Sequence, residues 1–95
     1  MKYRSRTDII EALLQSAMNG ATKTRLMYSA FLSYAQVQEY LKFLLGKQLL
    51  SFTEETQEYK LTEQGLHFLR TYREISEVVA LSDNKPENGA YVYAR

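Results

Sequence analysis

The spacing of apolar residues changes along this chain and later changes back, and this pattern restricts the fold more than any other feature of the sequence. Before Gly46 apolar residues recur three and four positions apart, as on one face of a helix, whereas residues 49–53 and 58–62 read as two short strands. From Glu63 the helical spacing returns for about twenty residues. In a chain of 95 residues, which has room for one compact domain, this order predicts a mainly α fold with one small β-hairpin.

Three helices are predicted before the hairpin, each with its own start and stop signals. Serine and threonine side chains accept hydrogen bonds from the N–H groups of a first helical turn, so they mark helix starts. The predicted N-caps are, in chain order, Ser5 or Thr7, Thr22 and Ser33. The predicted ends are Asn19-Gly20, Phe31-Leu32, and Gly46 after a third helix that runs to about Leu45.

The third of these helices has an apolar and a polar face. The face predicted to be buried holds Val37, Tyr40, Leu41 and Leu44, with Leu45 at its margin. The opposite face shows Ala35, Glu39 and Lys42, flanked by Gln36 and Gln38. Phe43 also falls towards the outside, which the spacing does not explain.

The hairpin is predicted from two alternating runs with a polar turn between them. Leu50 and Phe52 on the first strand can face Tyr59 and Leu61 on the second. The turn, residues 54–57, has no glycine and carries two glutamates.

The last helix is longer than a small core requires. Thr62 caps it, and it is predicted to run from Glu63 to about Ser82, a length of roughly 30 Å. Its apolar stripe continues past the core through Phe68, Tyr72, Ile75 and Val79. Another surface must cover this stripe, so these four residues are predicted to form a dimer contact.

Three regions follow from this arrangement. Residues 1–66 are predicted to form the folded head, residues 67–82 the dimerisation helix, and residues 83–95 a flexible tail. The tail begins with helix breakers and charges, and ends with a short apolar run that could instead add a strand or dock on a neighbour.

Composition excludes several classes of function. The chain has no cysteine and one histidine, His67, so disulfides, thiolate zinc sites and ordinary catalytic triads are not expected. We therefore expect no enzyme activity, no cofactor, no metal and no small-molecule substrate. No run approaches the roughly 18 apolar residues of a membrane span, so a cytoplasmic protein is expected.

Charge is divided unevenly along the sequence. Residues 1–50 carry seven cations and three anions, a net charge of +4, whereas residues 51–95 carry five cations and eight anions, a net charge of −3. The first half could therefore attract a polyanion that the second half repels, although a chance fluctuation in charge would look similar.

The order helix, helix, turn, helix, hairpin and long helix is that of a winged helix, in which the third helix enters a DNA major groove. Glutamine amides match adenine, lysine suits guanine or phosphate, and a helix N-terminus can hold a phosphate. The residues predicted to contact double-stranded DNA are Lys23, Arg25, Ser33, Tyr34, Gln36, Gln38 and Lys42.

Three stretches carry a more specific resemblance: Thr24-Arg-Leu-Met-Tyr-Ser-Ala-Phe-Leu-Ser-Tyr-Ala35, Tyr40-Leu-Lys-Phe-Leu44 and Tyr59-Lys-Leu-Thr-Glu-Gln-Gly65. Over about residues 6–80 the chain resembles archaeal winged-helix proteins of the Sulfolobus 10a type. The resemblance implies a homodimer whose long last helices pair as an antiparallel coiled coil, with two heads that bind DNA. By matching position, it implies that residues 33–42 form the recognition helix.

Two features depart from that expectation. The chain is nearly neutral, at +1, which favours a transcriptional regulator over an abundant packaging protein. The hairpin turn is acidic, with Glu54 and Glu55 followed by Glu58, so contact between the wing and phosphates is doubtful.

Several alternatives stay open. The winged helix could be a protein-interaction module that binds no DNA, with the acidic hairpin and the tyrosine-rich tail serving a partner. Tyr28, Tyr34 and Tyr40 either form a platform for single strands or pack at helix edges with their hydroxyls in water. The basic residues Lys2, Arg4 and Arg6 either touch DNA or form an ordinary charged terminus.

Overall fold

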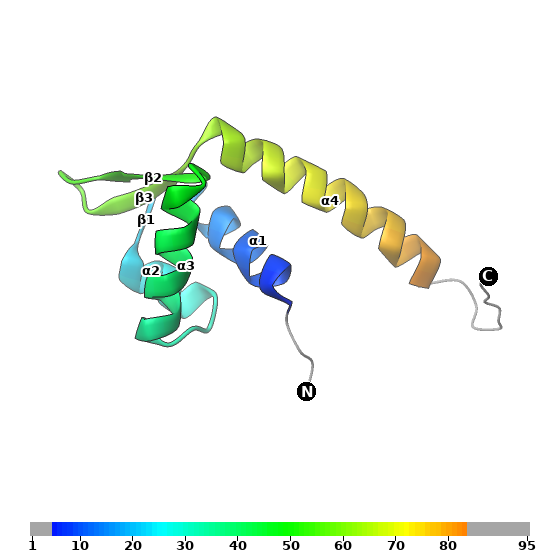
Figure 1. The fold of residues 1–95 in the computed structure, drawn as a ribbon, viewed down its shortest axis with the longest axis horizontal. Coiled ribbons are helices and arrows are strands. Elements are labelled where there is room, and N and C mark those ends of the chain that lie inside the picture. Colours follow the sequence, from blue (N-terminus) through cyan, green and yellow to red (C-terminus); the bar gives the residue numbers. More distant parts are fainter. Residues whose placement is uncertain (1–4, 84–95) are drawn as a thin grey trace.

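Four helices and three short strands make up the part of the chain that the structure, a computed structural model, describes: residues 5–83 (Figure 1). In chain order they are α1 (Arg6–Ser16), β1 (Ala21–Thr22), α2 (Lys23–Ser29), α3 (Tyr34–Gly46), β2 (Leu50–Thr53), β3 (Glu58–Leu61) and α4 (Glu63–Asp83). The prediction of a mainly helical winged fold is confirmed. The predicted tail, apart from Asp83, lies outside the described residues.

Side-chain caps start the helices where the sequence predicts. At α1 the Asp8 N–H donates to Ser5 Oγ (3.0 Å) while the Ser5 N–H donates to an Asp8 carboxylate oxygen (3.3 Å). At α3 the Gln36 N–H donates to Ser33 Oγ (3.1 Å) and the Ser33 N–H donates to Gln36 Oε1 (2.9 Å). Thr22 caps α2 through its side-chain oxygen. Ser5, rather than Thr7, is therefore the first cap, and each reciprocal pair satisfies two N–H groups that a helix start leaves without partners.

The helix ends differ from the prediction. α1 stops at Ser16, before the predicted Asn19-Gly20, and Gly20 takes the left-handed conformation (φ 96°) after an intervening turn. α3 continues through Gly46, and the left-handed residue that closes it is Gln48 (φ 61°). There the N–H groups of Gln48 and Leu49 donate to carbonyls of the last turn, so hydrogen bonds within the turn favour the left-handed residue without a glycine.

The hairpin has the predicted register, and a third strand joins it. Leu50 pairs with Leu61, and Phe52 pairs with Tyr59. The ring centroids of Phe52 and Tyr59 are 4.8 Å apart. The strand order is β1-β3-β2, with Ala21 of β1 paired to Tyr59. Sequence reasoning missed β1 because two residues are too few to show an alternating pattern.

The core is a single apolar cluster to which every helix contributes. Within residues 5–79 all of the buried side chains are apolar: Ile10, Leu13, Leu14, Ala17, Ala21, Leu26, Ala30, Leu32, Val37, Leu41, Leu44, Leu50 and Leu69. Val37, Leu41 and Leu44 lie on the predicted inner face of α3. That face is therefore confirmed, and the opposite face of the helix is left for solvent or a partner.

The start of α4 is fixed against the loop that follows α3. Thr62 Oγ1 donates to the Gln48 carbonyl (2.7 Å) and accepts from the Gly65 N–H (3.0 Å). The Thr62 N–H donates to the Leu49 carbonyl (3.2 Å). An added Cβ on Gly65 would lie 2.3 Å from that same carbonyl oxygen, so no larger residue fits this approach. The glycine of the Leu-Thr-x-x-Gly stretch is therefore required by packing.

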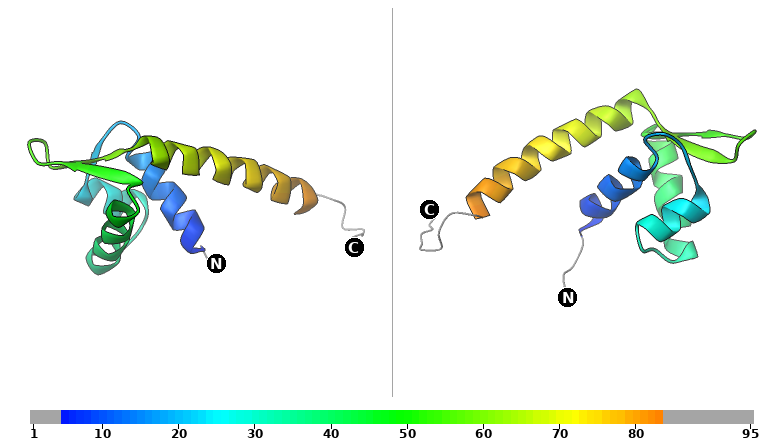
Figure 2. Two further views of the ribbon diagram at one scale, coloured as in Figure 1. Left: turned by 45° about the horizontal axis from the view of Figure 1, so that its top comes forward. Right: turned by 180° about the vertical axis from the view of Figure 1, so that it is seen from behind.

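The rest of α4 leaves the head, as Figures 1 and 2 show. Phe68 packs against the core, and the Tyr72 hydroxyl donates a hydrogen bond to the Asp8 carboxylate of α1. That bond, together with partial burial, raises the pKa of Tyr72 above its usual value. Further along, Ile75 and Val79 are half or more exposed. The apolar stripe is therefore most exposed from Ile75 onward, whereas Phe68 and Tyr72 are partly buried where α4 packs on the head.

No helix among the described residues is both long enough and apolar enough to cross a bilayer.

The tight approach at Gly65 gives a stability prediction. Gly65→Ala should lower the free energy of unfolding by about 1–3 kcal/mol, because the new methyl group meets a backbone carbonyl and the Leu61 side chain. Gly46→Ala is the matched control: nothing lies within 4 Å of its added Cβ, so it should leave stability unchanged or raise it by roughly 0.5–1 kcal/mol. Urea unfolding followed by circular dichroism measures both. Equal effects of the two substitutions would contradict the account of the junction.

Candidate nucleic-acid interface

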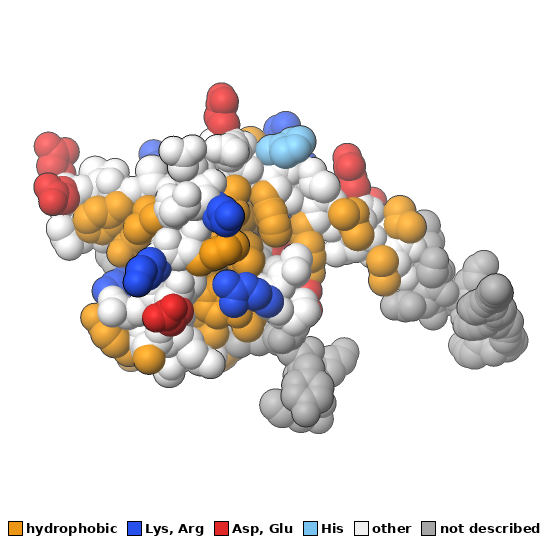
Figure 3. All heavy atoms as spheres, viewed as in Figure 1, with side chains coloured by type: hydrophobic (Ala, Val, Ile, Leu, Met, Phe, Trp, Pro, Cys, Tyr) orange, Lys and Arg blue, Asp and Glu red, His pale blue; other side chains and the backbone are white. Residues whose placement is uncertain are grey.

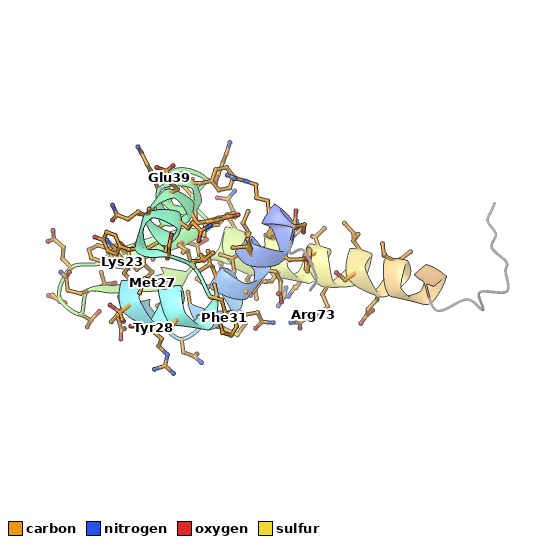
Figure 4. All side chains as sticks on the ribbon, turned by 90° about the horizontal axis from the view of Figure 1, so that it is seen from below. Lys23, Met27, Tyr28, Phe31, Glu39 and Arg73 are labelled. Carbon is orange, nitrogen blue, oxygen red and sulfur yellow. The ribbon has the colours of Figure 1, made fainter. Side chains whose placement is uncertain are left out.

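The exposed side of α3 forms a ridge on the surface of the head. Ala35, Glu39 and Lys42 lie along it and are exposed, opposite the buried face of the same helix. Figure 4 shows Glu39 on the side of α3 that faces away from α2. The ridge has a hollow on each side, and Glu39 and Lys42 line both of them.

The first hollow, of about 330 Å³, lies where α3 meets the start of α2 and strand β3. Lys23 of α2 is its central cation. The Lys23 ammonium donates to Gln38 Oε1 (2.6 Å) and to the Tyr34 hydroxyl (3.4 Å), and lies 4.9 Å from the Tyr34 ring centroid. The structure thus brings together three residues predicted to contact DNA, and holds the lysine beside the ridge.

The two glutamines predicted to read bases are engaged within the chain. Gln38 Oε1 accepts from Lys23, and Gln36 Oε1 accepts from the Ser33 N–H in the cap of α3. Recognition of adenine by glutamine uses both the oxygen and the NH2 group of the side-chain amide. Each side-chain oxygen therefore already accepts one hydrogen bond within the chain, which restricts how it can turn towards a base; the sequence did not show this.

Ser33 is the N-cap of α3. Its hydroxyl accepts the Gln36 N–H and its own N–H is donated to Gln36, so this residue closes the start of α3. A phosphate at this helix end would meet the N–H groups of Tyr34 and Ala35, which have no acceptor within the helix.

Arg25 and Lys23 leave α2 in different directions. Two positions along a helix correspond to about 200° of rotation, so the two side chains leave α2 on opposite sides. Lys23 faces α3, whereas Arg25 is exposed on the side away from it. From the sequence, both residues are expected to flank the recognition helix. The structure places Lys23, but not Arg25, beside α3.

The second hollow, of about 310 Å³, lies on the other side of the ridge, between α3 and the start of α1. The guanidinium carbon of Arg6 lies 5.2 Å from the ring centroid of Tyr40 and 5.0 Å from that of Phe43. The Lys47 ammonium lies 5.8 Å from the Phe43 ring centroid. Figure 3 shows basic side chains around hydrophobic ones on this face, over α3 and the start of α1. In the sequence, the outward position of Phe43 on α3 was the feature that could have indicated this hollow. In the structure, Arg6 and Lys47 both lie over its ring.

The three tyrosines do not form one platform. Tyr34 lies beside Lys23 and Tyr40 beside Arg6, on the two flanks of the ridge. Tyr28 is 70% exposed and lies on the opposite side of the head from Glu39 (Figure 4). A continuous stacking surface for single strands is therefore not present among these three rings.

The hairpin tip is acidic and exposed. Glu54 and Glu55 occupy the turn, where Gln57 adopts a left-handed conformation (φ 58°) and its side-chain amide donates to the Glu54 carbonyl (2.9 Å). Figure 3 shows the acidic side chains at the end of the hairpin, away from the basic side chains near α3. In the part of the chain that the structure describes, no cluster of three His, Cys, Asp or Glu residues is placed to hold a metal ion.

Comparisons with known proteins agree with this architecture. The crystal structure of Sso10a-2, a DNA-binding protein from Sulfolobus solfataricus, is similar in fold, with a TM-score of 0.73 and 22% sequence identity over 95% of this chain and 100% of that one. At the level of the fold, this similarity confirms the resemblance to the Sulfolobus 10a type. No curated protein sequence matches the chain. The family model described as winged helix-turn-helix matches residues 3–80, and the chain therefore belongs to the winged helix-turn-helix family.

Proposed function

We propose that this protein binds double-stranded DNA by inserting the ridge of α3 into the major groove. The observation that carries the proposal is the exposed ridge of α3 with Lys23 held at its side. Lys23 is bonded there to Tyr34 and Gln38, whose polar groups can also bind DNA. A major groove about 12 Å wide admits one α-helix. Membership of the winged helix-turn-helix family and similarity to a protein described as DNA-binding support the same conclusion.

Binding would exchange internal contacts for contacts with DNA. A phosphate near Lys23 would compete with Gln38 for the ammonium group, which frees the Gln38 oxygen for a base edge. Lys42 is exposed on the ridge, and a lysine side chain can bind guanine or phosphate. Phosphate contacts then position the head, while contacts from the ridge provide sequence preference.

The role proposed for the protein is transcriptional regulation in the cytoplasm, on the nucleoid, without a cofactor or an enzyme activity. The net charge of +1 supports a regulator, because non-specific coating of DNA depends on many cations that neutralise phosphates.

We also propose that the protein is a homodimer through α4. Ile75, Val78 and Val79 are exposed on the part of α4 that extends beyond the head, an arrangement that favours pairing with a second α4 as an antiparallel coiled coil. Phe68 and Tyr72 border this contact but also serve the packing of α4 on α1.

One observation favours the alternative of a protein-interaction module. Tyr28 and Phe31 are 70% and 83% exposed on the side of the head away from Glu39 (Figure 4). Exposed aromatic side chains are enriched at protein interfaces. Without DNA binding, this surface would be the first candidate for a partner.

The first prediction from the proposed function separates DNA binding from the protein-interaction alternative. Wild-type protein should bind mixed-sequence duplex DNA at low salt in a fluorescence anisotropy titration. Gln38→Ala and Lys42→Ala should reduce the preference among sequences, by roughly 1–3 kcal/mol for any bidentate base contact. Gln36→Ala is less suitable because it also removes half of the α3 cap. Saturable binding supports the DNA-binding function, and no binding below tens of micromolar favours the interaction module.

A second prediction concerns the acidic wing. If the hairpin lies near phosphates in the complex, changing Glu54 and Glu55 to Lys should tighten binding to all duplexes, and each new contact should add about 0.9 to the slope of log K against log salt. Changing Glu74 and Glu77 to Lys is the matched control, because it changes net charge equally on α4, far from the hairpin. Equal tightening by both pairs would mean that general charge, and not the position of the wing, sets affinity.

A third prediction tests the dimer. Ile75→Asp should give a monomer in light scattering, because an unpaired charge is costly in an apolar helix contact. Arg73→Asp places the same residue about 160° away around α4 and should leave the dimer intact. A wild-type protein that is monomeric at tens of micromolar would refute the coiled-coil assignment.

A further inference from the structure

The second hollow beside α3 contains a cluster that the recognition ridge does not account for. Phe43 lies on the outer half of α3 and is only partly exposed; it packs against the core on one side, and Arg6 and Lys47 lie over its ring. These three residues come from the start of α1, from α3 and from the residue that caps its end. An aromatic ring that gathers two cations on a surface is a specific arrangement, since long basic side chains otherwise sample many conformations.

The cluster is suited to bind an anion. The guanidinium carbon of Arg6 lies 5.2 and 5.0 Å from the ring centroids of Tyr40 and Phe43, and the group carries N–H donors in the planar fork that matches phosphate. Of the five residues that line the hollow, Arg6 and Lys42 are cations and Glu39 is the acid, and Lys47 adds a further cation beside Phe43. The hollow is thus positive overall and partly apolar.

The position of the cluster indicates which anion it meets. The ridge of α3 separates it from Lys23, so cations stand on both flanks of one helix. A helix in a major groove has one sugar-phosphate strand along each of its sides. Lys23 is placed to meet one strand, and the Arg6 cluster is placed to meet the other.

We propose that Arg6 and Lys47, held on the ring of Phe43, form a phosphate-binding site for the DNA strand that lies on the α1 side of α3. This inference rests on the proposed insertion of α3 into the major groove and adds a contact to the second strand. Such contacts do not read sequence, and they fix the angle at which the helix enters. The role of Phe43 is to position the two cations.

The test measures the salt dependence of binding for single substitutions in the full-length protein. Arg6→Ala and Lys47→Ala should each weaken binding to every duplex alike and lower the slope of log K against log salt by about 0.9. Arg6→Ala leaves the Ser5–Asp8 cap of α1 in place. Arg70→Ala, exposed on α4, is the matched control and should leave the slope unchanged.

Phe43→Leu tests whether the ring positions Arg6 and Lys47 without disturbing the fold. Leucine keeps apolar bulk in the helix but removes the ring. The substitution should weaken DNA binding in the wild-type background while circular dichroism and unfolding stay close to wild type. Combined with Arg6→Ala and Lys47→Ala, it should cause no further loss, since the ring acts through those two cations. An additional loss of the same size in the combined variant would show that Phe43 does not act through them.

Free phosphate is the other possible source of the same chemistry. Inorganic phosphate titrated into the protein alone, with amide shifts of residues 6, 43 and 47 followed by NMR, should give no saturation at millimolar concentrations, because one phosphate lacks the other contacts of a duplex. Saturation there, with an unchanged slope for Arg6→Ala, would overturn the inference in favour of a small-anion site. Wild-type DNA binding with unchanged slopes in both variants overturns the inference alone, whereas absence of wild-type binding overturns the proposed function and this inference together.

Discussion

The close approach of α4 to the loop after α3 is the constraint on which the rest of the structure depends. The Leu49 carbonyl accepts the Thr62 N–H and lies directly beneath Gly65, while Thr62 joins the Gln48 carbonyl to the first turn of α4. This junction ties together the end of α3, the two hairpin strands and the start of α4. It sets the direction in which α4 leaves the head, and therefore where the exposed residues around Ile75 stand relative to the ridge of α3.

Much of this architecture can be predicted from the sequence because it depends on local chemistry. The caps at Ser5, Thr22 and Ser33 follow from side-chain oxygens that serve nearby N–H groups, and the hairpin register follows from alternation within two short runs. The inner face of α3 follows from helical spacing. Features that need only neighbouring residues are thus accessible without a structure.

Features that depend on contacts between distant segments are not accessible in this way. Strand β1 forms because residues 21 and 22 meet β3, and the Tyr72 hydroxyl has a hydrogen-bond partner because Asp8 lies opposite it. The engagement of Gln38 by Lys23 spans 15 positions, and the support of Arg6 by Phe43 spans 37. In each case the sequence supplied the residue types, and tertiary packing decided which of their groups are free to act.

The charge division of the sequence becomes a division in space, and this bears on how DNA would approach. Arg6, Lys23, Lys42 and Lys47 all come from the basic first half and surround α3, whereas the acidic second half supplies the hairpin tip and α4. A polyanion is drawn to the first surface and repelled from the second. In a typical winged helix the hairpin helps to hold the DNA backbone; here its acidic tip opposes that contact. The flank on the α1 side, where Phe43 supports two cations, is then the part of the head best placed to take over that task, so α3 would be held between Lys23 and Arg6 rather than between Lys23 and the wing.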